Sequence, residues 1–261
     1  CSGDGGCRQR RLSCDTDQGV WRAHGGAGLD CAARSERSPE GDATILIVIP
    51  CAGEGRRFTE RGYTFPKPLI TIRNKPMIQW VVESLNMPWV KHVFVWQEAH
   101  AKQYPIREMC QQLTPYASVV TVPEETAGAM CTVLAALDTE LEPGGPLLIA
   151  NCDQWLEWDA NRFIHMATRP DVDGLIPVFS STHPKWSYVK LDERSRVTEV
   201  AEKCPISPWA TAGVYYWRDR AAFREAAQQI LDQDLRINGE FYVAPVYNRL
   251  IKDGGKVLAY P

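Results

Sequence analysis

The sequence has no long apolar run, no excess of charge of one sign and no closely spaced cysteine pair. Its longest apolar stretch, around residues 45–50, is far shorter than a membrane-spanning helix, and nothing near the N-terminus has the order of a signal peptide. The formal net charge is only -3, with both signs spread along the chain, so neither a nucleic acid nor a membrane surface is expected as a partner. We therefore expect a cytoplasmic protein, and the oligomeric state stays open, a homo-oligomer included.

The nine cysteines also lack a spacing pattern typical of disulfide cross-links or of a zinc site. Four of them fall in the first 31 residues, and the other five are scattered singly, without CxxC spacing or paired histidines. A disulfide framework and a zinc site are therefore not expected. Cys152, which stands beside an acid, is interpreted as a small core residue and not as a nucleophile.

Composition divides the chain into two parts. Residues 1–42 are rich in Gly, Arg, Ser and Asp, almost free of Ile, Val and Phe, and begin with Cys instead of Met. We expect them to be a disordered or non-native extension. Residues 43–261 have the composition of one globular domain, and 44% of the residues of the whole chain are hydrophobic.

Within the domain, apolar strands alternate with helical stretches, which is typical of βα units and a mostly parallel sheet. The expected strands of this part are 45–50, 92–96, 118–122 and 146–150, and the expected helices between them are 77–85, 106–113 and 128–137. The sequence predicts an α/β, Rossmann-like fold: a mostly parallel sheet flanked by helices.

After residue 153 the pattern loosens, and the next strands are predicted to form a small antiparallel insertion on the parallel core. The expected elements are a helix at 160–168, strands at 174–179, 187–191, 197–201 and 212–217, helices at 220–232 and 243–253, and a strand at 256–260. Because this last strand runs into the chain end, we expect the domain to be truncated at its C-terminus.

The loop that leaves the first strand, CAGEGRRF (51–58), has the composition of a phosphate-binding loop. Gly53 and Gly55 let backbone N–H groups approach a phosphate chain closely, and Arg56 and Arg57 can neutralise it. A tight turn after a strand is the other interpretation of a lone GxG. A nicotinamide dehydrogenase is disfavoured, because Phe58 stands where a third glycine would be needed.

Lys67 lies between two prolines in FPKPLI (65–70), which fixes the backbone around its ammonium group. Together with IPCAGEGRRF and KPMI (75–78), this segment resembles the N-terminal signature of the sugar-nucleotide pyrophosphorylases, a family of nucleotidyltransferases. Four further segments resemble the same family, so the likeness covers nearly all of residues 44–261. The resemblance implies the fold described above.

The resemblance also implies roles for the first two motifs. Ala52, Gly53, Gly55 and Arg57 would wrap the phosphates of an NTP, and Lys67 would stabilise charge during phosphoryl transfer, so that Arg57 and Lys67 are the catalytic candidates. These cations suit a reaction in which a phosphate oxygen attacks the α-phosphorus and pyrophosphate leaves. Arg56 departs from the family's usual small residue.

ETAGAMCTVLAA (125–136) resembles the segment that passes close to the nucleobase, which makes Thr126, Ala127 and Gly128 candidates for base contact. A helix start with a threonine cap is the simpler interpretation. In ANCDQW (150–155), Asp153 follows an apolar strand and resembles the family's ligand for Mg²⁺, a cation that binds through few carboxylates plus substrate phosphates. A capping Asp is the alternative, and the family's second metal-binding acid would lie beyond residue 261.

EVAEK (199–203) and ATAGVYYW (210–217) resemble the acceptor half of such a site. The resemblance implies that Glu202 accepts hydrogen bonds from sugar hydroxyls, that Lys203 binds the acceptor phosphate and that Gly213 allows close approach, with Asp153 also facing the acceptor. On an exposed strand a Glu-Lys pair is otherwise commonplace. Two positions depart from the family, which usually has Gly at Ser187 and Pro at Cys204.

NGEFYVAPVYN (238–248) resembles a subgroup associated with capsule or surface-glycan precursors. Glu240 is interpreted as a favourable charge at a helix start and not as a site residue. The predicted function is Mg²⁺-dependent transfer of NMP from an NTP to a sugar 1-phosphate. Two alternatives stay open: a cytidylyltransferase for a non-sugar phosphorylated acceptor, and a non-catalytic nucleotide- or sugar-binding module.

Overall fold

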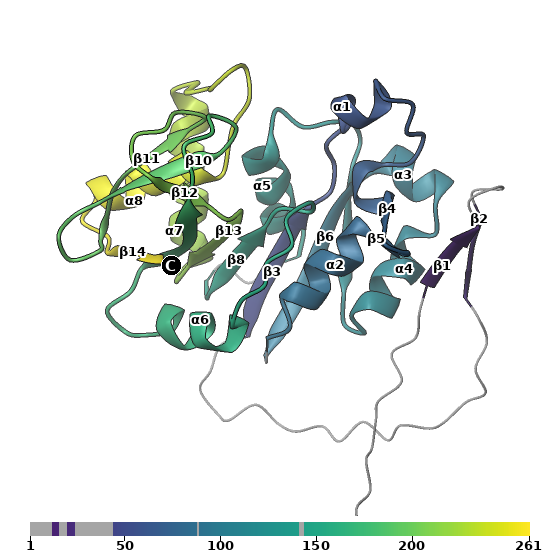
Figure 1. Cartoon of the computed structure of the whole chain (residues 1–261), viewed down its shortest axis with the longest axis horizontal. Coiled ribbons are helices and arrows are strands. Elements are labelled where there is room, and N and C mark those ends of the chain that lie inside the picture. The colour runs from purple at the N-terminus through teal and green to yellow at the C-terminus, as the bar shows by residue number, and fades with distance from the viewer. Residues whose placement is uncertain (1–11, 16–19, 24–43, 88, 141–143) are drawn as a thin grey trace, which may run out of the picture.

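The computed structural model describes residues 12–15, 20–23, 44–87, 89–140 and 144–261. Most of this part of the chain forms an α/β domain, as the sequence predicts, and the strands predicted as an antiparallel insertion belong to the same ten-stranded mixed sheet as the parallel strands (Figure 1). Leu12–Asp15 (β1) and Val20–Ala23 (β2) pair antiparallel as a separate ribbon, which the sequence did not lead us to expect. The remainder of the segment 1–42 lies outside the described residues, so the expectation of disorder there stays a prediction. No helix in the described ranges is long and apolar enough to cross a membrane.

Four neighbouring strands make up the parallel half of the sheet, in the order β8, β3, β6 and β7. Alternate residues of each strand point to opposite faces, and both faces are buried, which explains runs such as ILIVIP. The bounds are Ile45–Pro50 for β3, Val90–Gln97 for β6, Ser118–Val122 for β7 and Leu147–Ala150 for β8.

The second half of the sheet begins at β13, which runs antiparallel to β8 and to β9. The order then continues through β12 and β10 to β11 at the edge, while β14 pairs parallel with β9. The bounds are Gly174–Ser180 for β9, Ser187–Leu191 for β10, Val197–Glu202 for β11, Trp209–Thr211 for β12, Val214–Trp217 for β13 and Val257–Tyr260 for β14.

One predicted strand needs correction. The predicted strand 212–217 is the strand β13, which begins two residues later, at Val214, because the chain turns at Gly213 with φ +74°. The strand before this turn, β12, was not predicted; it pairs with the end of β9 and with β10, whereas β13 pairs with β8 and with the start of β9. Glycine permits this change of direction because it tolerates positive φ.

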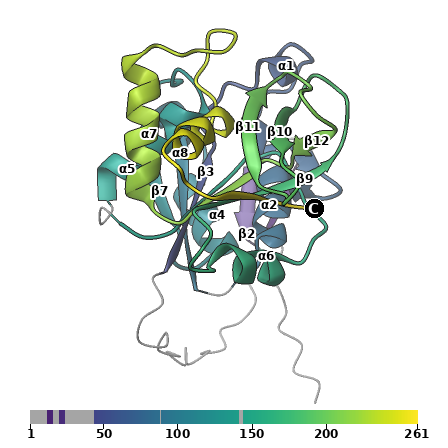
Figure 2. The same ribbon diagram turned by 90° about the vertical axis from the view of Figure 1, so that its left-hand side faces the viewer.

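Helices cover both faces of the sheet, and each face has its own hydrophobic cluster. On one face the cluster includes α5, α7 and α8, and on the other it includes α2, α4 and α6. Figure 2 shows α5 and α7 on one side of β3 and α2 and α6 on the other. The bounds are Met77–Ser84 for α2, Glu98–Gln103 for α3, Ile106–Leu113 for α4, Ala129–Glu140 for α5, Ala160–Ala167 for α6, Arg220–Asp232 for α7 and Tyr247–Lys252 for α8.

The expected helix 243–253 is also shorter than predicted. Its first part is a 3₁₀ turn, Ala244–Val246 (η2), and the α-helix α8 begins only at Tyr247. Pro245 lies in that turn and has no N–H to donate to a helical hydrogen bond. Further short elements are Arg56–Thr59 (α1), Lys67–Leu69 (η1), Thr71–Ile72 (β4) and Lys75–Pro76 (β5).

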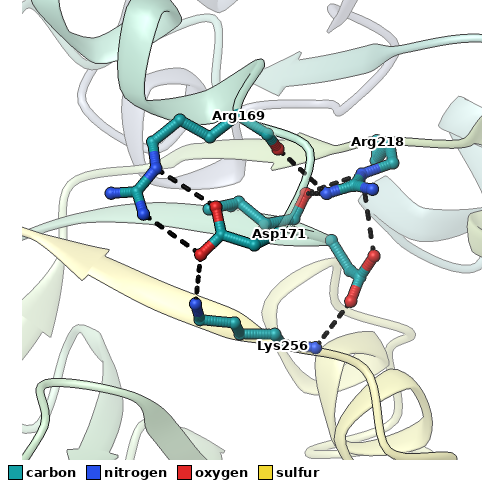
Figure 3. A network of polar contacts seen from close by, with 6 residues as sticks. Arg169, Asp171, Arg218 and Lys256 are labelled. Atoms are coloured by element: carbon teal, nitrogen blue, oxygen red, sulfur yellow. Dashed lines mark hydrogen bonds and ion pairs between the residues drawn. The ribbon is translucent and has the colours of Figure 1, made fainter.

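A polar network fastens the start of β14 to its neighbours at the amino end of β9 (Figure 3). Asp171 accepts two hydrogen bonds of 3.1 Å from Arg169 and forms an ion pair with Lys256. Arg218 donates to the carbonyls of Val172 at 2.8 Å and Arg169 at 3.0 Å. These contacts hold together the end of the sheet that lies away from the carboxyl ends of the parallel strands.

Candidate active site

A cavity of about 1250 Å³ opens beyond the carboxyl ends of β3 and β8, where ligands of open α/β sheets bind. Residues from both halves of the sheet line it, so the motifs spread over most of the domain meet at one place. The predicted site residues that line the cavity are Gly53, Gly55, Arg57, Lys67, Thr126, Ala127, Asp153, Glu202 and Lys203.

Two predicted site residues do not line this cavity. Ala52 is fully buried, and its carbonyl accepts a hydrogen bond of 2.6 Å from Gln97. Gly213 lies behind the wall, where an added Cβ would fall 2.8 Å from Nδ2 of Asn151 and overlap the amide of Gln154. Its lack of a side chain thus makes room for Gln154, which does line the cavity.

The glycine loop follows β3 and leads into the single turn of α1. Gly55 adopts φ +63°, and a Cβ at this position would lie 3.0 Å from Cβ of Lys67, so glycine allows the loop to approach Lys67 closely. Among the described residues Arg57 has no ion-pair partner, and its guanidinium is available to an anion in the cavity.

Lys67 and Asp153 form an ion pair at the floor of the cavity. Burial by itself lowers the pKa of Lys67, but the carboxylate of Asp153 outweighs burial and raises this pKa above its ordinary value. Lys67 is therefore protonated at neutral pH. The pair joins two motifs that are 86 residues apart in the sequence.

Arg56, the departure from the family pattern, is held at the mouth of the cavity by two carboxylates. Its guanidinium lies 2.9 Å from Glu54 and 3.1 Å from Glu125, and their charges raise its pKa. The backbone N–H of Glu54 also donates to Glu125 at 3.2 Å. These contacts connect the glycine loop to the segment predicted to read the nucleobase.

That segment is shaped by hydrogen bonds of its own. The hydroxyl of Thr126 donates to the carbonyl of Gly128 at 2.9 Å and lies 2.6 Å from the hydroxyl of Thr132, so its side chain holds the turn before α5. Backbone bonds then join the segment to Phe241, which donates to Ala127 at 2.9 Å and accepts from Met130 at 3.1 Å. The loop after α7 thereby closes one side of the cavity.

Glu202 lies at the end of β11, directly opposite Ser187 in the β10–β11 register. The Ser187 hydroxyl donates a hydrogen bond to the Glu202 carboxylate, so the serine that replaces the family's glycine fixes this acid. Burial raises the pKa of Glu202, opposed by that hydrogen bond and by the charge of Lys203. Deeper in the wall, burial raises the pKa of Tyr215 to about 12.

Lys203 extends toward Tyr242, a residue that the sequence analysis did not single out. Its ammonium group donates to the Tyr242 hydroxyl and lies 4.5 Å from the centroid of the ring. The backbone of Lys203 has φ +52°, and its N–H donates to Trp186 at 3.0 Å. Tyr242 belongs to NGEFYVAPVYN, the segment that resembles a subgroup associated with surface-glycan precursors, and that resemblance was the signal available for finding it.

A metal site can be judged from the donors present. Among the described residues no three His, Cys, Asp or Glu side chains gather as a metal cluster. Asp153, however, presents carboxylate oxygens to the cavity beside Lys67. One carboxylate completed by substrate phosphates fits the way in which Mg²⁺ is commonly bound.

The cavity thus brings together the glycine loop after β3, the ion pair of Lys67 with Asp153 after β8, and Lys203 after β11. The chain belongs to the MobA-like NTP transferase domain family, which its sequence matches over residues 47–236. This match establishes the protein as an enzyme of the nucleotidyltransferase class. No curated protein sequence matches the chain significantly.

Solved structures agree with this assignment. The nucleoside-diphosphate-sugar pyrophosphorylase from Vibrio cholerae RC9 superposes with a TM-score of 0.72 and 25% identity, over 82% of this chain and 91% of that one. A UDP-glucose pyrophosphorylase complexed with UDP-glucose gives 0.64 and 16%, over 84% and 90%. The inositol-1-phosphate CTP transferase from T. maritima gives 0.64 and 12%, over 84% and 86%. The latter two share the fold.

Proposed function

We propose that the protein joins an NMP unit from an NTP to a sugar 1-phosphate, forming an NDP-sugar and releasing pyrophosphate. The observation that carries this proposal is that Arg57, Lys67, Glu202 and Lys203 line one and the same cavity. The two cations Arg57 and Lys67 suit the phosphates of an NTP. Lys203 suits the phosphate of an acceptor, and Glu202 suits its hydroxyl groups. The similarity to a nucleoside-diphosphate-sugar pyrophosphorylase supports the same substrates.

In this reaction an oxygen of the acceptor phosphate attacks the α-phosphorus of the NTP, and the bond to the leaving pyrophosphate breaks. Arg57 and the protonated Lys67 stabilise the charge on the phosphates, while Lys203 aligns the acceptor phosphate and Glu202 accepts hydrogen bonds from the sugar. The attacking phosphate is already ionised, so no side chain needs to remove a proton from it.

Asp153 would hold Mg²⁺ in this proposal. The bound cation would supply charge stabilisation to the phosphates of the NTP. The ion pair with Asp153 keeps Lys67 charged and fixed beside the same phosphates. A role in making surface-glycan precursors, which the segment 238–248 favours, is part of the same proposal.

A second candidate reaction is cytidylyl transfer to a non-sugar phosphorylated acceptor. It is favoured by the hydrogen bond from Ser187 to Glu202, because this bond occupies part of the carboxylate that would otherwise bind sugar hydroxyls. The two reactions share the NTP half of the cavity and differ in the acceptor half.

The test measures pyrophosphate release from ATP, CTP, GTP, UTP and dTTP with Mg²⁺, each with glucose 1-phosphate, mannose 1-phosphate or phosphocholine. We expect release with one nucleotide and a sugar 1-phosphate, and a decrease of roughly 100-fold or more in the Asp153→Asn variant. Asp232→Asn, on the exposed side of α7, is the matched control. Release only with CTP and phosphocholine would favour the second candidate.

A Lys203→Met variant tests the division of the cavity into two halves. We expect its KM for the acceptor to rise and its KM for the NTP to stay unchanged. A rise in the KM for the NTP instead would contradict the assignment of Lys203 to the acceptor.

A further inference from the structure

Two cysteines lie side by side beyond the ends of β3 and β8. The parallel register pairs Leu46 with Leu147 and Val48 with Ile149, and continuing it by three residues places Cys51 opposite Cys152. Neighbouring strands are about 4.8 Å apart, which is within the Cα separation that a disulfide spans.

Both side chains also point to the same face of the sheet. Cys51 belongs to the hydrophobic cluster that includes Ile47 and Ile49, and Cys152 packs against this cluster, which also includes Ala150. The thiols are near enough for Cys152 to contribute, after burial, to a pKa of Cys51 that lies well above its ordinary value. Of the other cysteines in the described part of the domain 43–261, Cys110 lies on α4, Cys131 on α5 and Cys204 in an exposed loop.

The thiol pair is part of the cavity wall. Cys51 and Cys152 both line the cavity, where Cys51 has 1% of its surface exposed and Cys152 is partly exposed. A small molecule in the cavity thus meets Cys152 first and finds Cys51 directly behind it. Cys152 also immediately precedes Asp153, the partner of Lys67.

We propose that Cys51 and Cys152 form an oxidative modification site, at which a hydroperoxide converts the two thiols to a disulfide. The hydroperoxide first oxidises the Cys152 thiol to a sulfenic acid and is itself reduced to water or an alcohol. The Cys51 thiol then attacks the sulfenic sulfur, forming the S–S bond and releasing water. Two thiols are oxidised, and one hydroperoxide is reduced.

The disulfide has a consequence for the site. It tethers the residue next to Asp153 to the end of β3, and so restricts the motion of the carboxylate that holds Lys67. Oxidation should therefore lower turnover, and an NTP in the cavity should protect Cys152 from the oxidant. The loss of turnover rests on the proposed function, whereas formation of the disulfide does not.

The first experiment treats the reduced full chain with hydrogen peroxide and maps disulfides by mass spectrometry. Trypsin with a glutamate-specific protease releases residues 41–54, which contain Cys51, and residues 141–157, which contain Cys152, as separate peptides. We expect these two peptides to be linked, and Cys131→Ser, the matched control, to behave as the wild type. Sulfinic acid at Cys152 without linkage would overturn the proposal.

Phenylarsine oxide provides a second measurement that needs no oxidation, because its trivalent arsenic bridges two neighbouring thiols. We expect Cys51→Ser and Cys152→Ser each to bind one arsenical fewer than the reduced wild type. Cys131→Ser should bind as many as the wild type. If either variant of the pair fails to fold, the other still gives the answer. If a folded Cys51→Ser or Cys152→Ser protein binds as much arsenical as the wild type, the two thiols are not partners.

Turnover is then compared before and after oxidation for each variant against its own reduced baseline. We expect oxidation to lower the rate of pyrophosphate release by the wild type at least tenfold, and dithiothreitol to restore it. The rate of Cys152→Ser should not change on oxidation. A disulfide that leaves turnover unchanged overturns the inhibitory effect. A disulfide in a protein whose reduced form releases no pyrophosphate from any substrate pair supports the modification and contradicts the proposed function.

Discussion

His92 is a buried ionisable side chain within β6, stacked on Phe94 and far from solvent. Burial lowers its pKa to about 4, whereas the unfolded chain binds the proton near the ordinary value of about 6.5. The free energy of unfolding therefore keeps its full value, as far as His92 is concerned, above about pH 6.5. It decreases as the pH falls, by about 3 kcal/mol at pH ~4.

Urea unfolding of the wild type and of His92→Leu at pH 7 and pH 4.5 tests this. The variant should be less sensitive to acid than the wild type, because it lacks the group that must remain neutral. The same loss of stability in both proteins would show that other groups control the acid response.

Tyr242 is expected to position Lys203. Tyr242→Phe keeps the ring 4.5 Å from the ammonium group but removes the hydroxyl that accepts its hydrogen bond. The loss of one such bond, about 1 kcal/mol, should raise the KM for the acceptor by roughly fivefold and leave the KM for the NTP unchanged. Tyr116→Phe, at an exposed tyrosine, is the control, and equal changes in both KM values would contradict the role.

The sequence was sufficient to predict the residues that lie in short motifs. Lys67 and Asp153 were found in this way, and the structure brings both to one cavity. Their partners could not be predicted, because contacts such as Lys203 with Tyr242 and Arg56 with Glu125 join positions 39 and 69 residues apart. Such pairs depend on the folding of the chain and have no local pattern.

At the scale of elements, periodicity and apolar runs predicted most strands and helices within a few residues. The differences have local causes: the turn at Gly213 delays the start of β13, and Pro245 lies in the 3₁₀ turn that precedes α8. The helix Glu98–Gln103 was not predicted, because its six residues include no apolar side chain larger than alanine. Its formation depends on the strand and helix around it.

The junction between the loop after α7 and the start of α5 depends on one glycine. Gly128 has φ +136°, and an added Cβ would lie 2.6 Å from the backbone nitrogen of Phe241 and nearer still to its carbonyl oxygen. Gly128→Ala should therefore separate the two segments, lowering stability by about 2 kcal/mol and weakening NTP binding.

Thermal unfolding and nucleotide titration measure both effects. Gly239→Ala is a useful comparison, because its φ is +83° but an added Cβ would meet no atom within 4 Å. Nucleotide binding that is weakened equally in both variants would show that backbone strain, and not the contact with Phe241, is responsible.

The whole molecule should become more stable when it binds its nucleotide. The NTP would contact the glycine loop, the start of α5 and Asp153, groups that come together only in the folded chain. Binding to the native state alone stabilises it by about 2.7 kcal/mol when the ligand is at 100 times its Kd. The melting temperature should thus rise with the concentration of the correct NTP, and equal shifts with all nucleotides would contradict selective recognition of the base.

The position of β10 and β11 at the edge of the sheet has an evolutionary consequence. These strands carry Ser187 and Glu202; β12 pairs them with the rest of the sheet, and an isolated bridge joins Arg196, in the turn between them, to Leu258 of β14. Neither strand pairs with β3, β6, β7 or β8. Under the proposed function, descendants of one ancestral enzyme would therefore acquire new acceptors by changes in this hairpin, while the strands that carry the nucleotide half of the cavity keep their pairing.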